Sequence, residues 1–257
     1  MSDNQDLLLE RDGEVAIVTL NRAQARNALT FEMYTGLAEF CASPPDGVKA
    51  IIVRGAGEKA FAAGTDIRQF RGFKTAQDAI SYEQQIDWVL DTIETSPVPT
   101  IAAISGACTG GGAMIASVCD LRICAASLKF GFPIARTLGN TLSAQSLARL
   151  NVLVGAGRVR EMIFTSRLVE SDEASRIGIV SEVLDNAETL FQRATKLAQQ
   201  LAGQAPLTLR ATKVLQHRLL KQSIEDQDML LMCYQSEDFK HGLEAFLDKR
   251  KPDWKGE

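Results

Sequence analysis

Two glycine-rich segments contain the residues of this chain best suited to bind a polarised or negatively charged oxygen. Residues 61–67 read Phe-Ala-Ala-Gly-Thr-Asp-Ile, and residues 110–112 are three consecutive glycines. Both stand at a predicted junction between a strand and a helix. A helix start offers unpaired N–H groups and the positive end of the helix dipole, and missing side chains let a ligand approach the backbone. The two segments therefore predict a site for a carboxylate, a phosphate or a developing oxyanion.

The common phosphate-binding motifs do not match these segments. No Gly-Lys-Ser/Thr follows either of them, which excludes a P-loop. The spacing of Gly106, Gly110 and Gly111 also differs from the dinucleotide-binding fingerprint. A lone glycine triplet most often serves a turn only, and on these residues alone that interpretation stays open.

The elements that would position the two segments alternate between strand and helix. Residues 14–20 and 49–54 are β-branched runs that predict strands buried on both faces. Between them, Thr30 can cap a helix whose apolar residues recur at helical spacing, which suggests a right-handed crossover. Further along the chain we expect a helix, a strand, a glycine-rich turn, a short helix and a strand, at residues 75–94, 100–104, 106–112, 113–117 and 120–124. From residue 143 onward the pattern is helical almost throughout, with breaks at 155–157, 178 and 203–206. The sequence thus predicts one α/β core with a helical C-terminal region.

Composition and charge exclude several classes of protein. With 28 basic and 32 acidic residues the net charge is −4, so no broad positive field exists to hold a nucleic acid. The five cysteines form no Cys-x-x-Cys pair, which indicates buried thiols in a reducing compartment and no metal site. The first ten residues lack a basic leader segment, and the apolar runs are too short to span a membrane. We expect a cytoplasmic protein without nucleic-acid or membrane partners.

In order and separation, several motifs resemble those of the crotonase, or enoyl-CoA hydratase/isomerase, superfamily. They include Leu-Asn-Arg at 20–22 with Arg-Asn-Ala-Leu at 26–29, both glycine-rich segments, Cys-Asp at 119–120, Phe-Gly-Phe-Pro at 130–133 and Ala-Phe-Leu-Asp-Lys-Arg-Lys-Pro at 245–252. The resemblance implies an α/β fold, a crotonase-like spiral of ββα units with a helical C-terminal trimerisation region. It assigns residues 1–195 to the core and 196–257 to the oligomerisation region. A homotrimer or hexamer is then the expected assembly.

The resemblance also implies a site for an acyl-CoA or enoyl-CoA thioester. The backbone N–H groups of Thr65 and Gly111 would form an oxyanion hole that stabilises a thioester enolate, and an amide donor there does not depend on the side chain. Phe246 and Lys249 would meet the adenine and phosphate end of the coenzyme. The residues expected to bind substrate are Arg26, Ala28, Ala63, Gly64, Asp66, Ile67, Gly110, Met114, Ile134, Arg136, Phe246 and Lys249. Coenzyme A is part of the substrate, and we expect no tightly bound cofactor and no metal.

The chain departs from the family at the two glutamates that hydratases use to activate and protonate water. Met114 and Ile134 stand at those positions, and neither side chain can transfer a proton, so efficient hydration by the usual route is not expected. Arg136 could bind a substrate carboxylate, although a surface or inter-subunit role is the simpler interpretation. The alternatives are a non-hydratase enzyme (an isomerase or a decarboxylase) and an acyl-CoA-binding protein with weak catalysis. For Asp66 and Asp120 the expected roles are structural.

Overall fold

The strands form two sheets in the part of the chain that the structure, a computed structural model, describes. The described residues are 6–222, 228, 232, 236–238, 241–242, 245, 248, 250 and 252–257. The larger sheet has the order β1-β2-β3-β5-β7-β10, and its strands are β1 (Leu7–Asp12), β2 (Val15–Leu20), β3 (Ala50–Gly55), β5 (Thr100–Ile104), β7 (Leu121–Ala125) and β10 (Glu182–Leu184). Only β1 runs antiparallel to its neighbour there.

The smaller sheet is built from very short strands that follow those of the larger one along the chain. Its order is β4-β6-β8-β9, and its strands are β4 (Ala60–Ala62), β6 (Ala107–Thr109), β8 (Lys129–Gly131) and β9 (Val169–Glu170). Three successive units, β3-β4-α2, β5-β6-α3 and β7-β8-α4, each place one strand in each sheet and then a helix. The fold is therefore the predicted α/β spiral of ββα units.

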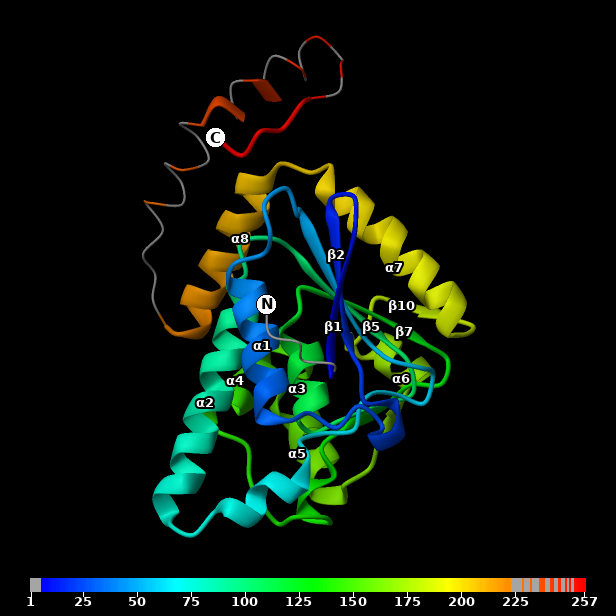
Figure 1. Cartoon of the computed structure of the whole chain (residues 1–257), viewed down its shortest axis with the longest axis vertical. Helices are drawn as coiled ribbons and strands as arrows, with labels where there is room; N and C mark the ends of the chain where they lie inside the picture. The colour runs from blue at the N-terminus through cyan, green and yellow to red at the C-terminus, as the bar shows by residue number, and fades with distance from the viewer. Residues whose placement is uncertain are drawn as a thin grey trace.

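Helices cover both faces of the larger sheet (Figure 1). Alternate residues of the strands pack on α1, α2 and α3 on one face and on α7 on the other. The helices are α1 (Phe31–Ala42), α2 (Ala76–Glu94), α3 (Gly111–Val118), α4 (Ala144–Val154), α5 (Ala156–Thr165), α6 (Ser171–Arg176), α7 (Ala187–Ala202) and α8 (Pro206–Leu220). Short 3-10 helices are η1 (Ala23–Ala25), η2 (Ile67–Gly72) and η3 (Pro133–Ala135). Because α3 begins where the glycine triplet ends β6, the core fixes the position of that helix start.

The long predicted elements are confirmed, with two differences around the glycine-rich segments. Thr30 caps α1 by accepting a hydrogen bond from the Met33 N–H, and Thr75 caps α2. The predicted turn at 106–112 contains strand β6, because its three residues pair with β4 and β8. The segment at 61–67 leads into the 3-10 helix η2 and not into an α-helix.

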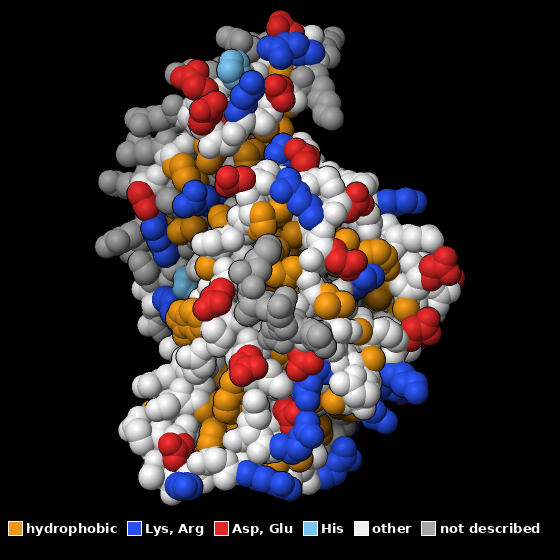
Figure 2. All heavy atoms as spheres, in the orientation of Figure 1, with side chains coloured by type: hydrophobic (Ala, Val, Ile, Leu, Met, Phe, Trp, Pro, Cys, Tyr) orange, Lys and Arg blue, Asp and Glu red, His pale blue; other side chains and the backbone are white. Residues whose placement is uncertain are grey.

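The region predicted to be helical almost throughout from residue 143 onward contains helices α4 to α8 but also the short strands β9 and β10, and there the prediction is wrong because these strands pair with β8 and β7, far away in the sequence. Helix α7 continues across the division predicted between residues 195 and 196, and that division stays a prediction, as does trimerisation. No helix among the described residues is long and apolar enough to cross a membrane. Figure 2 shows acidic and basic side chains interspersed over much of the visible face, as expected from a net charge of −4.

Candidate functional site

The loop between β2 and α1 is held against β4 by a buried asparagine. The Asn27 side chain accepts a hydrogen bond from the Arg22 N–H and donates to the carbonyl oxygens of Ala56 and Ala60. Asn27 is fully buried, so these bonds satisfy its amide where water cannot. The backbone N–H of Ala63 also donates to the carbonyl of Arg26 at 3.0 Å. The predicted site residues Arg26 and Ala63 therefore lie side by side.

The backbone N–H group of Thr65 has no hydrogen-bond partner in the part of the chain that the structure describes. Leu29 forms a parallel bridge to Thr65, in which the Leu29 N–H donates to Gly64 and the Leu29 carbonyl accepts from Asp66, both at 2.8 Å. Because the neighbours of Thr65 make both bonds, its own N–H points away from Leu29. Among the described residues no acceptor is found for this amide.

The second predicted donor, Gly111, is the first residue of α3. Amides of a first helical turn have no partner within their own helix, and no acceptor for the Gly111 N–H is found in the described part of the chain. The preceding Gly110 has φ +52°, a conformation that favours glycine, and a Cβ added there would lie 3.6 Å from the Cα of Gly64. The two glycine-rich segments thus run against each other, with both unbonded amides at the same junction.

Met114 and Ile134 are buried, with 2% and 8% of their surface exposed. Met114 lies one turn into α3, and its N–H donates to the Gly110 carbonyl. Ile134 lies in η3, just after the strand whose Gly131 carbonyl accepts from the Gly110 N–H at 3.0 Å. Both positions, at which the resemblance led us to expect the glutamates of hydratases, hold buried apolar side chains.

Asp66 is a buried carboxylate with two arginine partners. Its oxygens accept from the Arg68 backbone N–H, from the Arg68 side chain at 2.6 Å and 2.9 Å, and from the Arg22 side chain at 3.0 Å. The hydrogen bonds from Arg68, more than those from Arg22, hold the pKa of this carboxyl far below its usual range. Asp66 stays ionised and holds the turn after Thr65, which is the structural role expected from the sequence.

Three hydroxyl groups meet at the side of Thr65 and were not predicted from the sequence. The Thr65 Oγ1 lies 2.9 Å from the Tyr34 hydroxyl and 3.0 Å from the Tyr82 hydroxyl, and each pair is hydrogen-bonded. Burial raises the pKa of Tyr82 to about 12 and that of Tyr34 well above its usual value. Both phenols are therefore protonated at neutral pH.

Glu83 is a third residue, after Tyr34 and Tyr82, that sequence reasoning missed. It lies in α2 next to Tyr82, is partly buried, and accepts a hydrogen bond from the backbone N–H of Ser143. Burial and the nearby Asp87 raise the pKa of this carboxyl. Its only sequence signal was its place in the helix predicted at 75–94.

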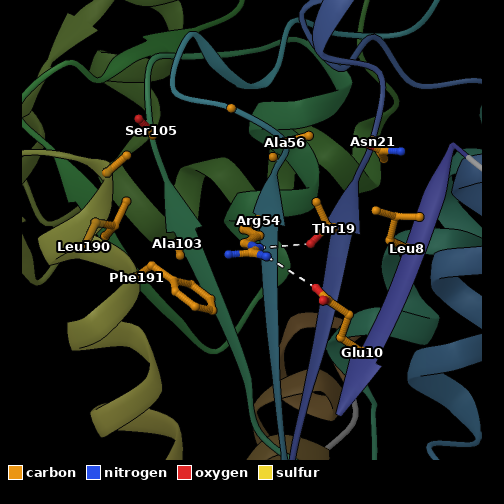
Figure 3. Close-up of a pocket in the computed structure, with 13 residues that line it drawn as sticks. Leu8, Glu10, Thr19, Asn21, Arg54, Ala56, Ala103, Ser105, Leu190 and Phe191 are labelled. Atoms are coloured by element: carbon orange, nitrogen blue, oxygen red, sulfur yellow. Dashed lines mark hydrogen bonds and ion pairs between the residues drawn. The ribbon is translucent and has the colours of Figure 1, made fainter. Parts of the chain in front are cut away.

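Of two pockets on the protein, one lies beside this junction and the other does not. A pocket of about 450 Å³ lies between α1, α2 and η2, and Tyr34, Tyr82 and Phe73 are part of its wall. The pocket in Figure 3 lies on the α7 side, where Arg54 donates to Thr19 and Glu10 and lies over the Phe191 ring. None of the predicted site residues lines the pocket of Figure 3.

The remaining predicted residues lie at the edge of the junction or outside the described part. Ile67 is 58% exposed, and Arg136 is exposed at the end of η3. Ala28 is half-buried and its carbonyl accepts from the Arg22 side chain. Phe246 and Lys249 lie outside the described residues.

The other polar clusters have structural explanations. Asp120 accepts from the backbone N–H and the hydroxyl of Thr100 and pairs with Lys213, as expected for a structural carboxylate. Asp91, Glu94 and His217 are close enough to hold a metal ion, but Arg149 already pairs with both carboxylates. Four of the cysteines are free and buried, and Cys233 lies outside the described residues.

Comparisons with known proteins agree on the family. Residues 10–257 match the family model described as enoyl-CoA hydratase/isomerase. A short-chain-enoyl-CoA hydratase of Clostridium acetobutylicum is 34% identical over 255 residues, 96% of each chain, and a crotonyl-CoA hydratase of Syntrophomonas wolfei is 32% identical over 254 residues, also 96% of each. The crystal structure of an enoyl-CoA hydratase/carnithine racemase from Magnetospirillum magneticum superimposes with a TM-score of 0.89 at 35% identity, covering 98% of this chain and 96% of that one. This chain belongs to the enoyl-CoA hydratase/isomerase family.

Proposed function

We propose that the protein is an enzyme that binds an acyl-CoA or enoyl-CoA thioester and holds its carbonyl oxygen between the amides of Thr65 and Gly111. The observation that carries the proposal is the meeting of two unbonded N–H groups at one junction, next to glycines that admit a ligand. Two preorganised donors stabilise charge that develops on the oxygen when a thioester enolate forms, and each is worth about 3 kcal/mol. The names of the relatives, which act on enoyl-CoA substrates, support this class of substrate.

Hydration through a glutamate pair is not part of the proposal. Adding water to an enoyl thioester needs a group that takes a proton from water and one that delivers a proton to carbon. Met114 and Ile134 provide neither, because both side chains are apolar and buried. The proposed chemistry is enolate formation on a CoA thioester, as an isomerase or a decarboxylase requires.

Hydration of crotonyl-CoA tests this proposal directly. The wild-type protein should hydrate crotonyl-CoA about 100- to 10,000-fold more slowly than a family hydratase, measured by loss of the enoyl absorbance. The double change Met114→Glu with Ile134→Glu should raise the rate, although burying two carboxylates will cost stability. The matched control is Met114→Gln with Ile134→Gln, which adds polar side chains of the same size without an acid or a base. Efficient hydration by the unmodified protein would contradict the proposal.

A second candidate function is acyl-CoA binding without turnover, favoured by the apolar residues at both glutamate positions. Tight binding of enoyl, dienoyl and malonyl-type CoA thioesters without conversion of any of them would support it. In either case Lys249→Ala should weaken binding of a CoA thioester more than binding of a truncated pantetheine thioester. Equal losses for both ligands would remove Lys249 from the coenzyme site.

A further inference from the structure

The Tyr34 hydroxyl lies directly against the backbone of Gly111. A Cβ built on Gly111 would be 1.7 Å from the Tyr34 hydroxyl oxygen and 3.2 Å from the Thr65 Oγ1. The side chain of Tyr34 comes from α1, is 1% exposed, and belongs to the main hydrophobic core, so its ring is fixed by packing. Glycine at position 111 is what leaves room for the hydroxyl between the two proposed donor residues.

The hydroxyl groups of Tyr34, Thr65 and Tyr82, which form a hydrogen-bonded chain, have one proton more than their two mutual hydrogen bonds require. Three neutral hydroxyls carry three protons, and the two hydrogen bonds of the chain occupy two of them. The third proton must therefore belong to one of the three groups and point out of the chain. In two of the three arrangements it lies on Tyr34 or Thr65, beside the unbonded amides.

Protonation and position together make this chain a hydrogen-bond donor. Burial raises the pKa of Tyr34, so the phenol keeps its proton throughout the neutral range. A donor in a buried, fixed position needs no reorganisation when charge develops next to it. Met114 and Ile134 are apolar, whereas the Tyr34 hydroxyl contacts Thr65 and lies against Gly111, the two residues of the proposed oxyanion donors.

We propose that the Tyr34 hydroxyl donates a third hydrogen bond to the thioester oxygen of a bound acyl-CoA, with Thr65 and Tyr82 orienting it. This inference rests on the proposed function, because it needs the thioester between Thr65 and Gly111. No covalent bond forms or breaks in the step. The phenol keeps its proton while the oxygen gains charge, and the hydrogen bond becomes stronger as the enolate forms.

The carbonyl stretching frequency of bound substrate measures this donation. Isotope-edited infrared spectra of crotonyl-CoA, with and without ¹³C at the thioester carbonyl, isolate this band, which moves to lower frequency as the oxygen accepts more hydrogen bonds. Binding to the wild-type protein should lower the frequency. Tyr34→Phe should lose roughly a third of that lowering, since one of three donors is removed. The matched control, Tyr82→Phe, removes the distal hydroxyl of the chain and should change the frequency less.

Each outcome separates this inference from the function on which it rests. A wild-type protein that binds crotonyl-CoA without lowering the frequency would overturn the proposed oxyanion hole itself. If the carbonyl frequency falls equally in the wild type and in Tyr34→Phe, only the proposal that Tyr34 is a third donor is overturned. If Tyr34→Phe does not fold, replacement of Tyr34 by 3-fluorotyrosine tests the third donor instead. The fluorinated residue keeps the ring and the hydroxyl group, and its hydroxyl is a stronger hydrogen-bond donor than that of tyrosine. The inference requires a further lowering with 3-fluorotyrosine, and an unchanged frequency contradicts it.

Discussion

Replacing Gly111 by alanine tests whether the Tyr34 hydroxyl occupies the place that the structure gives it. A larger residue at position 111 should crowd a ligand that approaches the backbone there. The structure adds a cost to folding, because the new Cβ would lie 1.7 Å from the Tyr34 hydroxyl, and Cβ contacts below 3.0 Å essentially never occur. One of the two groups must therefore move by about 1.3 Å, in a core where Tyr34 is 1% exposed.

The loss of stability expected for Gly111→Ala is the sum of two contributions. Overpacking of this kind costs about 1–3 kcal/mol, and displacing the Tyr34 hydroxyl from Thr65 costs about 1 kcal/mol more. We expect Gly111→Ala to lower the free energy of unfolding by about 3 kcal/mol. In a Tyr34→Phe background the nearest ring atom would be 3.0 Å away, and the same change should cost only about 1 kcal/mol. The difference of about 2 kcal/mol is the coupling between the two positions.

Thermal denaturation of the two single variants, the double variant and the wild type measures this coupling. For a chain of this size about 2 kcal/mol corresponds to roughly 4–8 °C in Tm. The matched control is Gly157→Ala in α5, where no atom lies within 4 Å of the added Cβ, and it should be neutral or stabilising. An equal cost of Gly111→Ala with and without the Tyr34 hydroxyl would refute the steric argument.

Three further predictions concern ionisation and assembly. Asp66→Asn should cost about 1–3 kcal/mol at neutral pH, because buried Arg22 keeps Asp6 as an ionised partner but loses the Asp66 carboxylate. Since folding lowers the pKa of Asp66, the difference in Tm from wild type should narrow as the pH falls below about 4. Glu83→Gln keeps an acceptor for the Ser143 N–H and should raise Tm at neutral pH. Folding raises the pKa of Glu83, so the wild type loses stability as the pH rises through that pKa, and the higher Tm of the variant should disappear in acid. Light scattering should give the mass of a trimer or a hexamer, and a stable monomer at micromolar concentration would contradict the expected assembly.

The long elements of the fold were predictable because local signals and burial agree there. Strands β2 and β3 are β-branched runs buried on both faces, and α1 and α2 have threonine caps followed by helical spacing of apolar residues. The strands of the smaller sheet were missed because β4, β6 and β8 have three residues each. Three residues are too few to show an alternation, and their pairing depends on contacts between distant parts of the chain.

The backbone groups of the candidate site could be predicted from the sequence, but its side-chain hydroxyls could not. Glycines before a helix start mark a place where N–H groups are free, and the resemblance to a family identified Thr65 and Gly111. Tyr34 and Tyr82 were missed because they lie 31 and 17 residues from Thr65 in the sequence, on two different helices. One signal was present: a tyrosine on the apolar face of a predicted helix needs a partner for its hydroxyl.

The hydroxyl chain and the missing glutamates lead to the same conclusion about the chemistry. A phenol whose pKa is raised by burial can donate a hydrogen bond at neutral pH, but it cannot take a proton from water. Met114 and Ile134 cannot do so either, and both are buried. A site with three donors and no base beside them polarises a thioester oxygen far better than it activates a water molecule. If such a site turns over, the substrate must either carry its own leaving group, such as a carboxylate lost as carbon dioxide, or bring its carbon acid within reach of a more distant base such as Glu83.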